Sequence, residues 1–191
     1  MKNIIASLAL CALTSSPAFA ATFIGSQTTG HSVVTDYAAE GLISFDLDLK
    51  DWAPVTLSYQ LTAADLGAGL DFNAVLRNLS GIGLNHITVS LTGATFQSLG
   101  TVTRSFDPAA SVALANGGQQ AVVNLGSPEY LDIAMGNALG SAGARNWVIN
   151  TTGLQAGDVL TATVAVPEPQ SHALALVGLI AIGMRRLARR Q

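Results

Sequence analysis

Strict alternation of apolar and polar residues constrains the fold of this chain more than any other feature of its sequence. The segments ISFDLDLK (43–50), VTLSYQL (55–61) and HITVSLTG (86–93) all keep this alternation. A period of two puts successive side chains on opposite faces of a β-strand, whereas a helix needs a period near 3.6. Further strands are predicted in FNAVL (72–76), QAVVNL (120–125), YLDIAM (130–135), NWVI (146–149) and VLTATVAV (159–166).

Turn-forming segments separate these strands. They are DWAP (51–54), NLSGIG (78–83), ANGG (115–118) and TTGLQAGD (151–158). Short strands at this spacing predict an all-β domain, an antiparallel β-sandwich over residues 21–165. Segments 61–70 and 135–143 could each hold one helical turn, and residues 22–39 an edge strand or a partly disordered stretch. No long helix is expected before the C-terminal tail.

The first 20 residues read as a secretory signal peptide. Lys2 precedes the apolar run IIASLALCAL (4–13), Pro17 breaks it, and small residues follow at Ala18 and Ala20, so Ala21 would be the first mature residue. A buried N-terminal helix is the alternative. The Sec translocon and a signal peptidase are the partners that such a signal implies.

The only cysteine, Cys11, lies inside this predicted signal. It lacks the small preceding residue expected of a lipoprotein acceptor. The mature chain would therefore have no cysteine and no disulfide.

The last residues have the pattern of a short membrane anchor. Residues 173–184 are apolar on all sides, and Arg185, Arg186, Arg189 and Arg190 follow in the segment 185–191. As a helix these twelve residues would reach only about 18 Å, against a hydrocarbon core of about 30 Å. Ser171, His172 and snorkelling arginines could extend the span. Basic residues stay cytoplasmic, so the ectodomain would lie outside the inner membrane. A core helix with a solvated basic end is the alternative.

The tail, residues 166–191, resembles the PEP-CTERM sorting signal. The parts that match are the motif Val166, Pro167, Glu168 and Pro169, the apolar run 173–184, and the four arginines. The resemblance implies an exported bacterial protein that is processed by a membrane-embedded transpeptidase of the exosortase type. Such proteins are surface or matrix components of bacteria that make exopolysaccharide. It implies nothing about the activity of the ectodomain.

Small residues recur every third position in the predicted helix, at Ala175, Gly178 and Ala181. Such a strip lets another helix approach closely and could dock the tail on its processing enzyme. The alternative is that small residues only keep the helix weakly hydrophobic.

The charge of the ectodomain excludes one class of partner. Between residues 21 and 166 there are eleven acidic and only four basic residues, while the whole chain has a formal charge of −3. An acidic domain lacks the basic footprint that nucleic-acid binding requires.

Little in the sequence points to catalysis. There is no His/Asp/Glu metal set and no G-x-S-x-G elbow, and no cofactor is expected. Asp46, Asp48 and Asp51 are weak candidates for calcium binding. Asp46 and Asp48 could instead form the carboxylate pair of a glycosidase. Solvated charges on an outer strand face are the simpler explanation. Trp52 could stack on sugar rings or pack within its loop. Trp147 is expected in the core.

These observations predict a non-catalytic exported protein. It would be anchored transiently in the inner membrane, then released to the cell surface or extracellular matrix with exopolysaccharide. The alternatives are a carbohydrate-binding module for exopolysaccharide and a secreted hydrolase.

Overall fold

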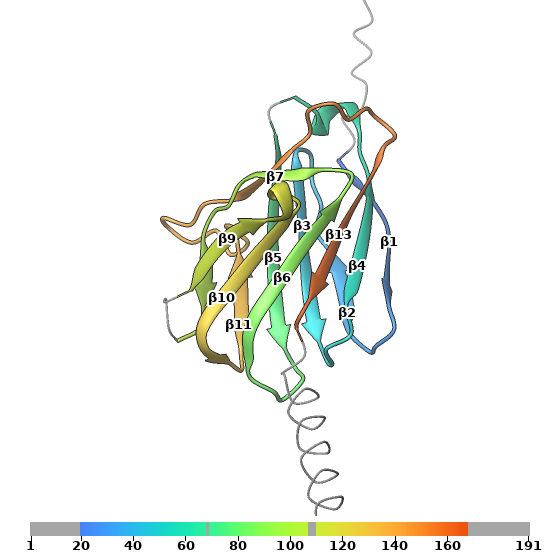
Figure 1. Ribbon diagram of the computed structural model, residues 1–191. Coiled ribbons are helices and arrows are strands. Elements are labelled where there is room, and N and C mark those ends of the chain that lie inside the picture. The colour runs from blue at the N-terminus through green and yellow to red at the C-terminus, as the bar shows by residue number, and fades with distance from the viewer. Residues whose placement is uncertain (1–19, 68, 107–109, 168–191) are drawn as a thin grey trace, which may run out of the picture.

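The protein is all-β, as the alternation predicts. A computed structural model describes residues 20–67, 69–106 and 110–167 (Figure 1). Within these ranges there is no α-helix, and only two short 3-10 turns occur, η1 (Ala63–Asp65) and η2 (Asn116–Gly118). The first lies in one of the two segments expected to hold a helical turn. The other segment, 135–143, forms no helix.

The first sheet has the strand order β1-β4-β13-β6-β10-β9, and all its pairs are antiparallel. The last strand of the domain, β13, therefore lies in the interior of the sheet. Its strands span Thr22–Thr28 (β1), Val55–Gln60 (β4), Val159–Ala165 (β13), Leu84–Thr92 (β6), Gln120–Glu129 (β10) and Ser111–Ala115 (β9).

The second sheet has the order β2-β3-β5-β11-β8, and β12 joins β5 to β7. The strand β5 pairs with β12 through its first residues and with β11 through its last. The strands span Val33–Asp36 (β2), Leu42–Leu49 (β3), Leu70–Asn78 (β5), Asp132–Met135 (β11), Val102–Arg104 (β8), Trp147–Asn150 (β12) and Thr95–Ser98 (β7).

One strand pair corrects the expectation of an entirely antiparallel fold. The strands β3 and β5 pair in parallel over Leu42–Leu49 and Leu70–Asn78. The strand between them in the sequence, β4, belongs to the other sheet. The chain therefore crosses to the first sheet to form β4 and returns to the second sheet to form β5. This crossover lets β5 run in the same direction as β3.

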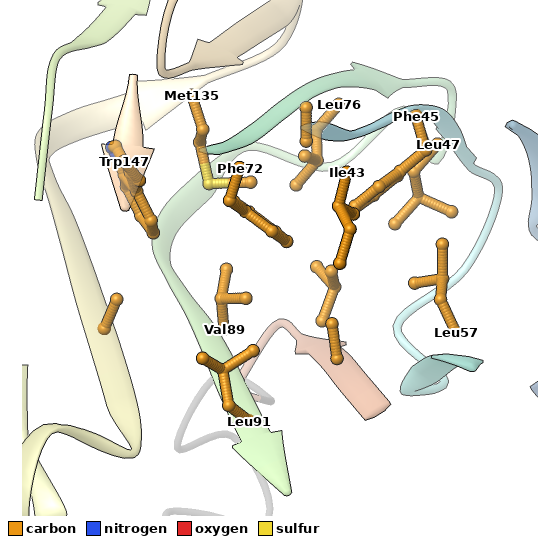
Figure 2. Close-up of a cluster of buried hydrophobic side chains, with 14 of the residues drawn as sticks. Ile43, Phe45, Leu47, Leu57, Phe72, Leu76, Val89, Leu91, Met135 and Trp147 are labelled. Carbon is orange, nitrogen blue, oxygen red and sulfur yellow. The ribbon is translucent and has the colours of Figure 1, made fainter. Parts of the chain in front are cut away.

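The alternating residues face a single core, as predicted. In β3, Ile43, Phe45, Leu47 and Leu49 are at most 2% exposed, while the polar residues between them are partly exposed. The strands β4 and β6 show the same alternation. Figure 2 shows side chains of both sheets in contact with this core, among them Leu57, Phe72 and Val89.

Phe72 is the centre of an aromatic cluster in this core. Its ring lies 5.7 Å from Phe45, 5.9 Å from Phe96 and 6.0 Å from Trp147, measured between ring centroids. Trp147 is fully buried, as expected from the sequence, and its indole N–H donates to the carbonyl oxygen of Thr101 at 3.2 Å. Because these rings come from β3, β5, β7 and β12, the cluster joins strands that are far apart in the sequence.

None of the helices in the described residues is long and apolar enough to cross a membrane. The segment expected to do so, 173–184, lies outside the described residues, and so does the predicted signal up to residue 19.

The aromatic cluster generates a test of the fold. We expect Phe72→Ala to lower the free energy of unfolding by about 3–5 kcal/mol, because it removes a ring that three others contact. Ser44→Ala, on the outer face of β3, should change it by less than about 0.5 kcal/mol. Urea unfolding of the purified proteins measures both. Similar values for the two variants would contradict this account of the core.

Candidate functional site

The end of the domain at which β13 finishes is the candidate functional site, because the predicted sorting motif starts there. Val166 is only 7% exposed and packs in the core, whereas Pro167 is exposed. The motif thus begins inside the folded domain. Glu168, Pro169 and the rest of the tail lie outside the described residues.

Five connections open at this same end, which we call the exit face. They are the β1–β2, β3–β4, β5–β6, β8–β9 and β10–β11 connections, and the structure describes residues 105, 106 and 110 of the β8–β9 connection. Figure 1 shows the end of β13 among these connections. The strand directions explain this position. In the first sheet β13 is antiparallel to β4 and β6, and β6 is antiparallel to β10. In the second sheet β3 and β5 are parallel, and the N–H of Leu79 donates to the carbonyl of Leu49 just past their ends.

Exposed apolar side chains gather on the exit face. Leu79 and Ile82 lie in the β5–β6 connection, and Tyr130 and Leu131 in the β10–β11 connection. Between 43% and 58% of each residue is exposed. We call these four residues the apolar cluster. Single exposed apolar residues are ordinary, but a group of them suggests an interaction surface.

Asn78 holds the two connections that carry the apolar cluster together. Its buried side-chain amide donates to the carbonyl oxygens of Ile82, at 2.7 Å, and Glu129, at 3.0 Å. Its side-chain oxygen accepts from the Ser80 hydroxyl at 2.7 Å. A buried amide satisfied in this way fixes both loops, because breaking any of these bonds would leave a buried polar group unpaired.

Tyr130 lies directly over the glycine of the neighbouring connection. A Cβ atom placed on Gly83 would come within 2.6 Å of Pro128 and 2.8 Å of the Tyr130 ring. Glycine at position 83 therefore allows the two loops to pack against each other.

A buried ion pair supports the β10–β11 connection from beneath. Arg104 Nε donates to Glu129 Oε2 at 3.0 Å, and the two side chains are 3% and 6% exposed. The guanidinium also donates to the carbonyl and hydroxyl oxygens of Ser127. The other oxygen of Glu129 accepts the N–H groups of Tyr130 and Leu131. The ion pair thus fixes the backbone that presents two members of the apolar cluster.

Asp51 joins the β1–β2 and β3–β4 connections. Its carboxylate accepts the N–H groups of His31, in the β1–β2 connection, and Ala53, in its own. The His31 Nδ1 atom lies 3.2 Å from the same carboxylate. These contacts, the His31 N–H first among them, hold the pKa of Asp51 below its ordinary value, against a smaller effect of burial.

Asp46 and Asp48 lie apart from Asp51, on the outer face of β3. Both pair with Arg77 of β5, Asp46 at 3.3 Å and Asp48 at 2.6 Å. The structure thus divides the three carboxylates proposed for calcium between two sets of partners. Among the residues that it describes, no group of three or more His, Cys, Asp or Glu side chains could hold a metal ion.

Trp52 follows Asp51 in the β3–β4 connection and is partly buried. Its indole nitrogen is buried and has no hydrogen-bond partner. This position agrees with packing within the loop and leaves only part of the ring to stack on a ligand. His86 is exposed on β6, and the side chain of His31 is 91% exposed.

Two open depressions are lined by residues outside the apolar cluster. One, of about 400 Å³, is lined by Gly93, Ala94, Thr95, Gln119, Asn150 and Thr152. The other, of about 260 Å³, is lined by Ala110, Ser111, Asn124 and Gly126. Neither presents an aromatic or charged side chain among the described residues, so neither has the groups that usually bind sugars or carry out acid–base catalysis.

At the other end of the chain, Ala20 is partly exposed, and Ala21 is 2% exposed and packs in the core. The expected first mature residue is therefore part of the folded domain. Ala18 lies outside the described residues. Comparison with protein-family models, with curated proteins and with solved structures finds no match to this chain.

The buried ion pair gives a double-mutant test. Arg104→Leu should cost about 3–5 kcal/mol of stability, because it leaves a buried carboxylate without its cation. Adding Glu129→Gln should recover more than about 1 kcal/mol, since the amide oxygen still accepts backbone N–H groups but carries no charge. Denaturant unfolding of the two single variants and the double variant measures this coupling. Strictly additive losses would show that the two side chains do not interact.

Asp51 predicts an acid-sensitive contribution to stability. The pKa of Asp51 is lower in the folded protein than in the unfolded chain. The ionised carboxylate therefore stabilises the fold fully above its ordinary pKa, and this stabilisation is lost as the pH falls through the lower pKa of the folded state. Asp51→Asn should therefore lower the melting temperature at neutral pH, and the difference from the original protein should shrink at about pH 3. Thermal unfolding at both pH values tests this. An equal difference at both would assign the effect to lost packing instead of charge.

Proposed function

We propose that this chain is an exported bacterial cell-surface or extracellular-matrix protein, sorted and processed through its C-terminal tail. The observation that carries the proposal is the ordered set of Val166 to Pro169, the apolar run 173–184 and the terminal arginines. The Sec pathway would deliver the chain, the tail would anchor it transiently in the inner membrane, and an exosortase-type transpeptidase would process it there.

The position of Val166 supports processing on its C-terminal side. Val166 packs in the core and follows β13, which is hydrogen-bonded on both sides. A cut before Val166 would remove a core residue, whereas a cut after it would leave the domain whole. The exposed Pro167 is the first residue of the motif beyond the packed chain.

We propose a non-catalytic role for the domain, as a matrix component associated with exopolysaccharide. The paired carboxylates Asp46 and Asp48 share one guanidinium on an open sheet face. A glycosidase instead holds its two carboxyl groups on either side of a bound sugar. This arrangement favours solubility and surface charge over hydrolysis.

Intact-mass measurement of the protein from its native cells tests the proposal. We expect a C-terminus between Pro167 and Pro169, with or without an added group, because the motif and the packing of Val166 both favour a cut there. A chain that still ends at Gln191 would contradict processing and would indicate a membrane-tethered domain.

A motif variant provides the control. The Pro167→Ala/Pro169→Ala protein should retain Gln191, whereas Ser44→Ala, remote from the motif on β3, should be processed normally. Equal processing of both variants would show that the motif does not direct the cut.

A further inference from the structure

The tail and the apolar cluster share one end of the domain. Pro167 leaves β13 on the exit face, and Leu79, Ile82, Tyr130 and Leu131 are exposed in two of the connections around it (Figure 1). Phe106, which is 85% exposed, follows β8 at the same end. Val159 at the far end of β13 and Leu139 in the β11–β12 connection lie apart from this face.

The chain beyond Pro167 is too short to hold the exit face far from the apolar run. Five residues, 168–172, separate Pro167 from Ala173. Even fully extended, the six steps from Pro167 to Ala173 cover at most about 20 Å. The headgroup region on each side of the hydrocarbon core is about 5–8 Å thick. An inserted apolar run would therefore hold Pro167 within about 15 Å of the outer edge of the headgroups, close enough for the exit face to reach them.

From this juxtaposition we infer that the exit face is a membrane-contact surface, whose apolar cluster inserts into the headgroup region of the bilayer that holds the tail. The inference rests on the proposed function, because it requires residues 173–184 to lie in the membrane. The ligand is a lipid surface and not a single headgroup, since the cluster is apolar and spread over two loops.

The side chains of the cluster suit this location. Tyrosine has an apolar ring and a polar tip, which is the combination that membrane interfaces favour, and leucine and isoleucine supply apolar area. Glu129, the carboxylate beside Tyr130, is buried and paired with Arg104 within the protein. Asp132 is exposed and lies opposite Arg77 in the β11–β5 register. Lys50, exposed elsewhere on the face, adds a cation that anionic lipids would attract.

Two further features favour contact. The loops are held in place by Asn78 and by the Arg104–Glu129 pair, so little conformational freedom is lost when they meet the lipid. The tail also makes the contact intramolecular. A short tether raises the effective concentration of the second site, so a patch too small to bind membranes by itself becomes occupied.

Site-specific labelling of the full-length chain tests the inference. Cys11 is the only cysteine, so a Cys11→Ser background allows one label at a chosen position. An environment-sensitive fluorophore would be attached at Ile82→Cys on the exit face, at Ala156→Cys in the β12–β13 connection at the opposite end, or at Ile180→Cys in the apolar run. Each protein is reconstituted into phosphatidylethanolamine–phosphatidylglycerol vesicles with nitroxide-labelled lipid.

We expect lipid-dependent quenching and a blue shift of emission at positions 82 and 180, and neither at position 156. Quenching at 180 without quenching at 82 would overturn the membrane-contact surface and leave the anchor in place. A label at 180 that stays in water would overturn the anchor and, with it, this inference. A blue shift at 82 without lipid quenching would indicate a protein partner, and would also overturn it.

A second set of variants tests whether the apolar cluster itself contributes to lipid contact, beyond the closeness to the membrane that the tail imposes. With the label moved to Asn85→Cys, the Leu79→Ser/Ile82→Ser substitutions should reduce quenching, because they remove apolar area on the exit face. Leu139→Ser, at a site that is 65% exposed and lies away from that face, is the control and should leave quenching unchanged. Equal quenching in both variants would show that the tether alone places the face and that the cluster does not insert.

Discussion

The pairing of β13 with both β4 and β6 is the interaction on which the rest of this structure depends. Removing the strand would divide the first sheet and would open the core beside Leu160, Ala162 and Val164. The last strand in the sequence is thus a central one in space. Under the proposed export route the domain could complete its core only after residue 165 had crossed the membrane, shortly before the predicted apolar run at 173–184 reached it. Folding and anchoring would then be nearly simultaneous.

Buried polar groups decide the shape of the exit face. Hydrophobic burial is non-directional and would tolerate several loop arrangements, but Asn78 and the Arg104–Glu129 pair require defined partners. A variant with apolar residues in place of both Arg104 and Glu129 could be as stable as the original protein, because the cost of desolvating the two charges offsets much of their attraction. What the buried groups add is therefore a fixed position for the β10–β11 backbone, and with it the presentation of Tyr130 and Leu131.

The sequence predicted the faces of the strands better than their partners. Alternation assigned the buried side of β3, β4 and β6 correctly, because one face of each packs on the core. The parallel β3–β5 pair could not be predicted, since strand pairing depends on how the chain crosses between sheets. The short strands β7, β8 and β9 were missed as well. Their three to five residues are too few to show a period.

The supporting residues of the site were missed for a related reason. Asn78 falls in a segment predicted to form a turn, and Arg104 lies in a strand of three residues. A signal was nevertheless present. Arg77 and Arg104 are two of only four basic residues between positions 21 and 166, and both pair with carboxylates of other strands. In a chain with so little charge, an isolated arginine in a strand therefore suggests a carboxylate partner on another strand.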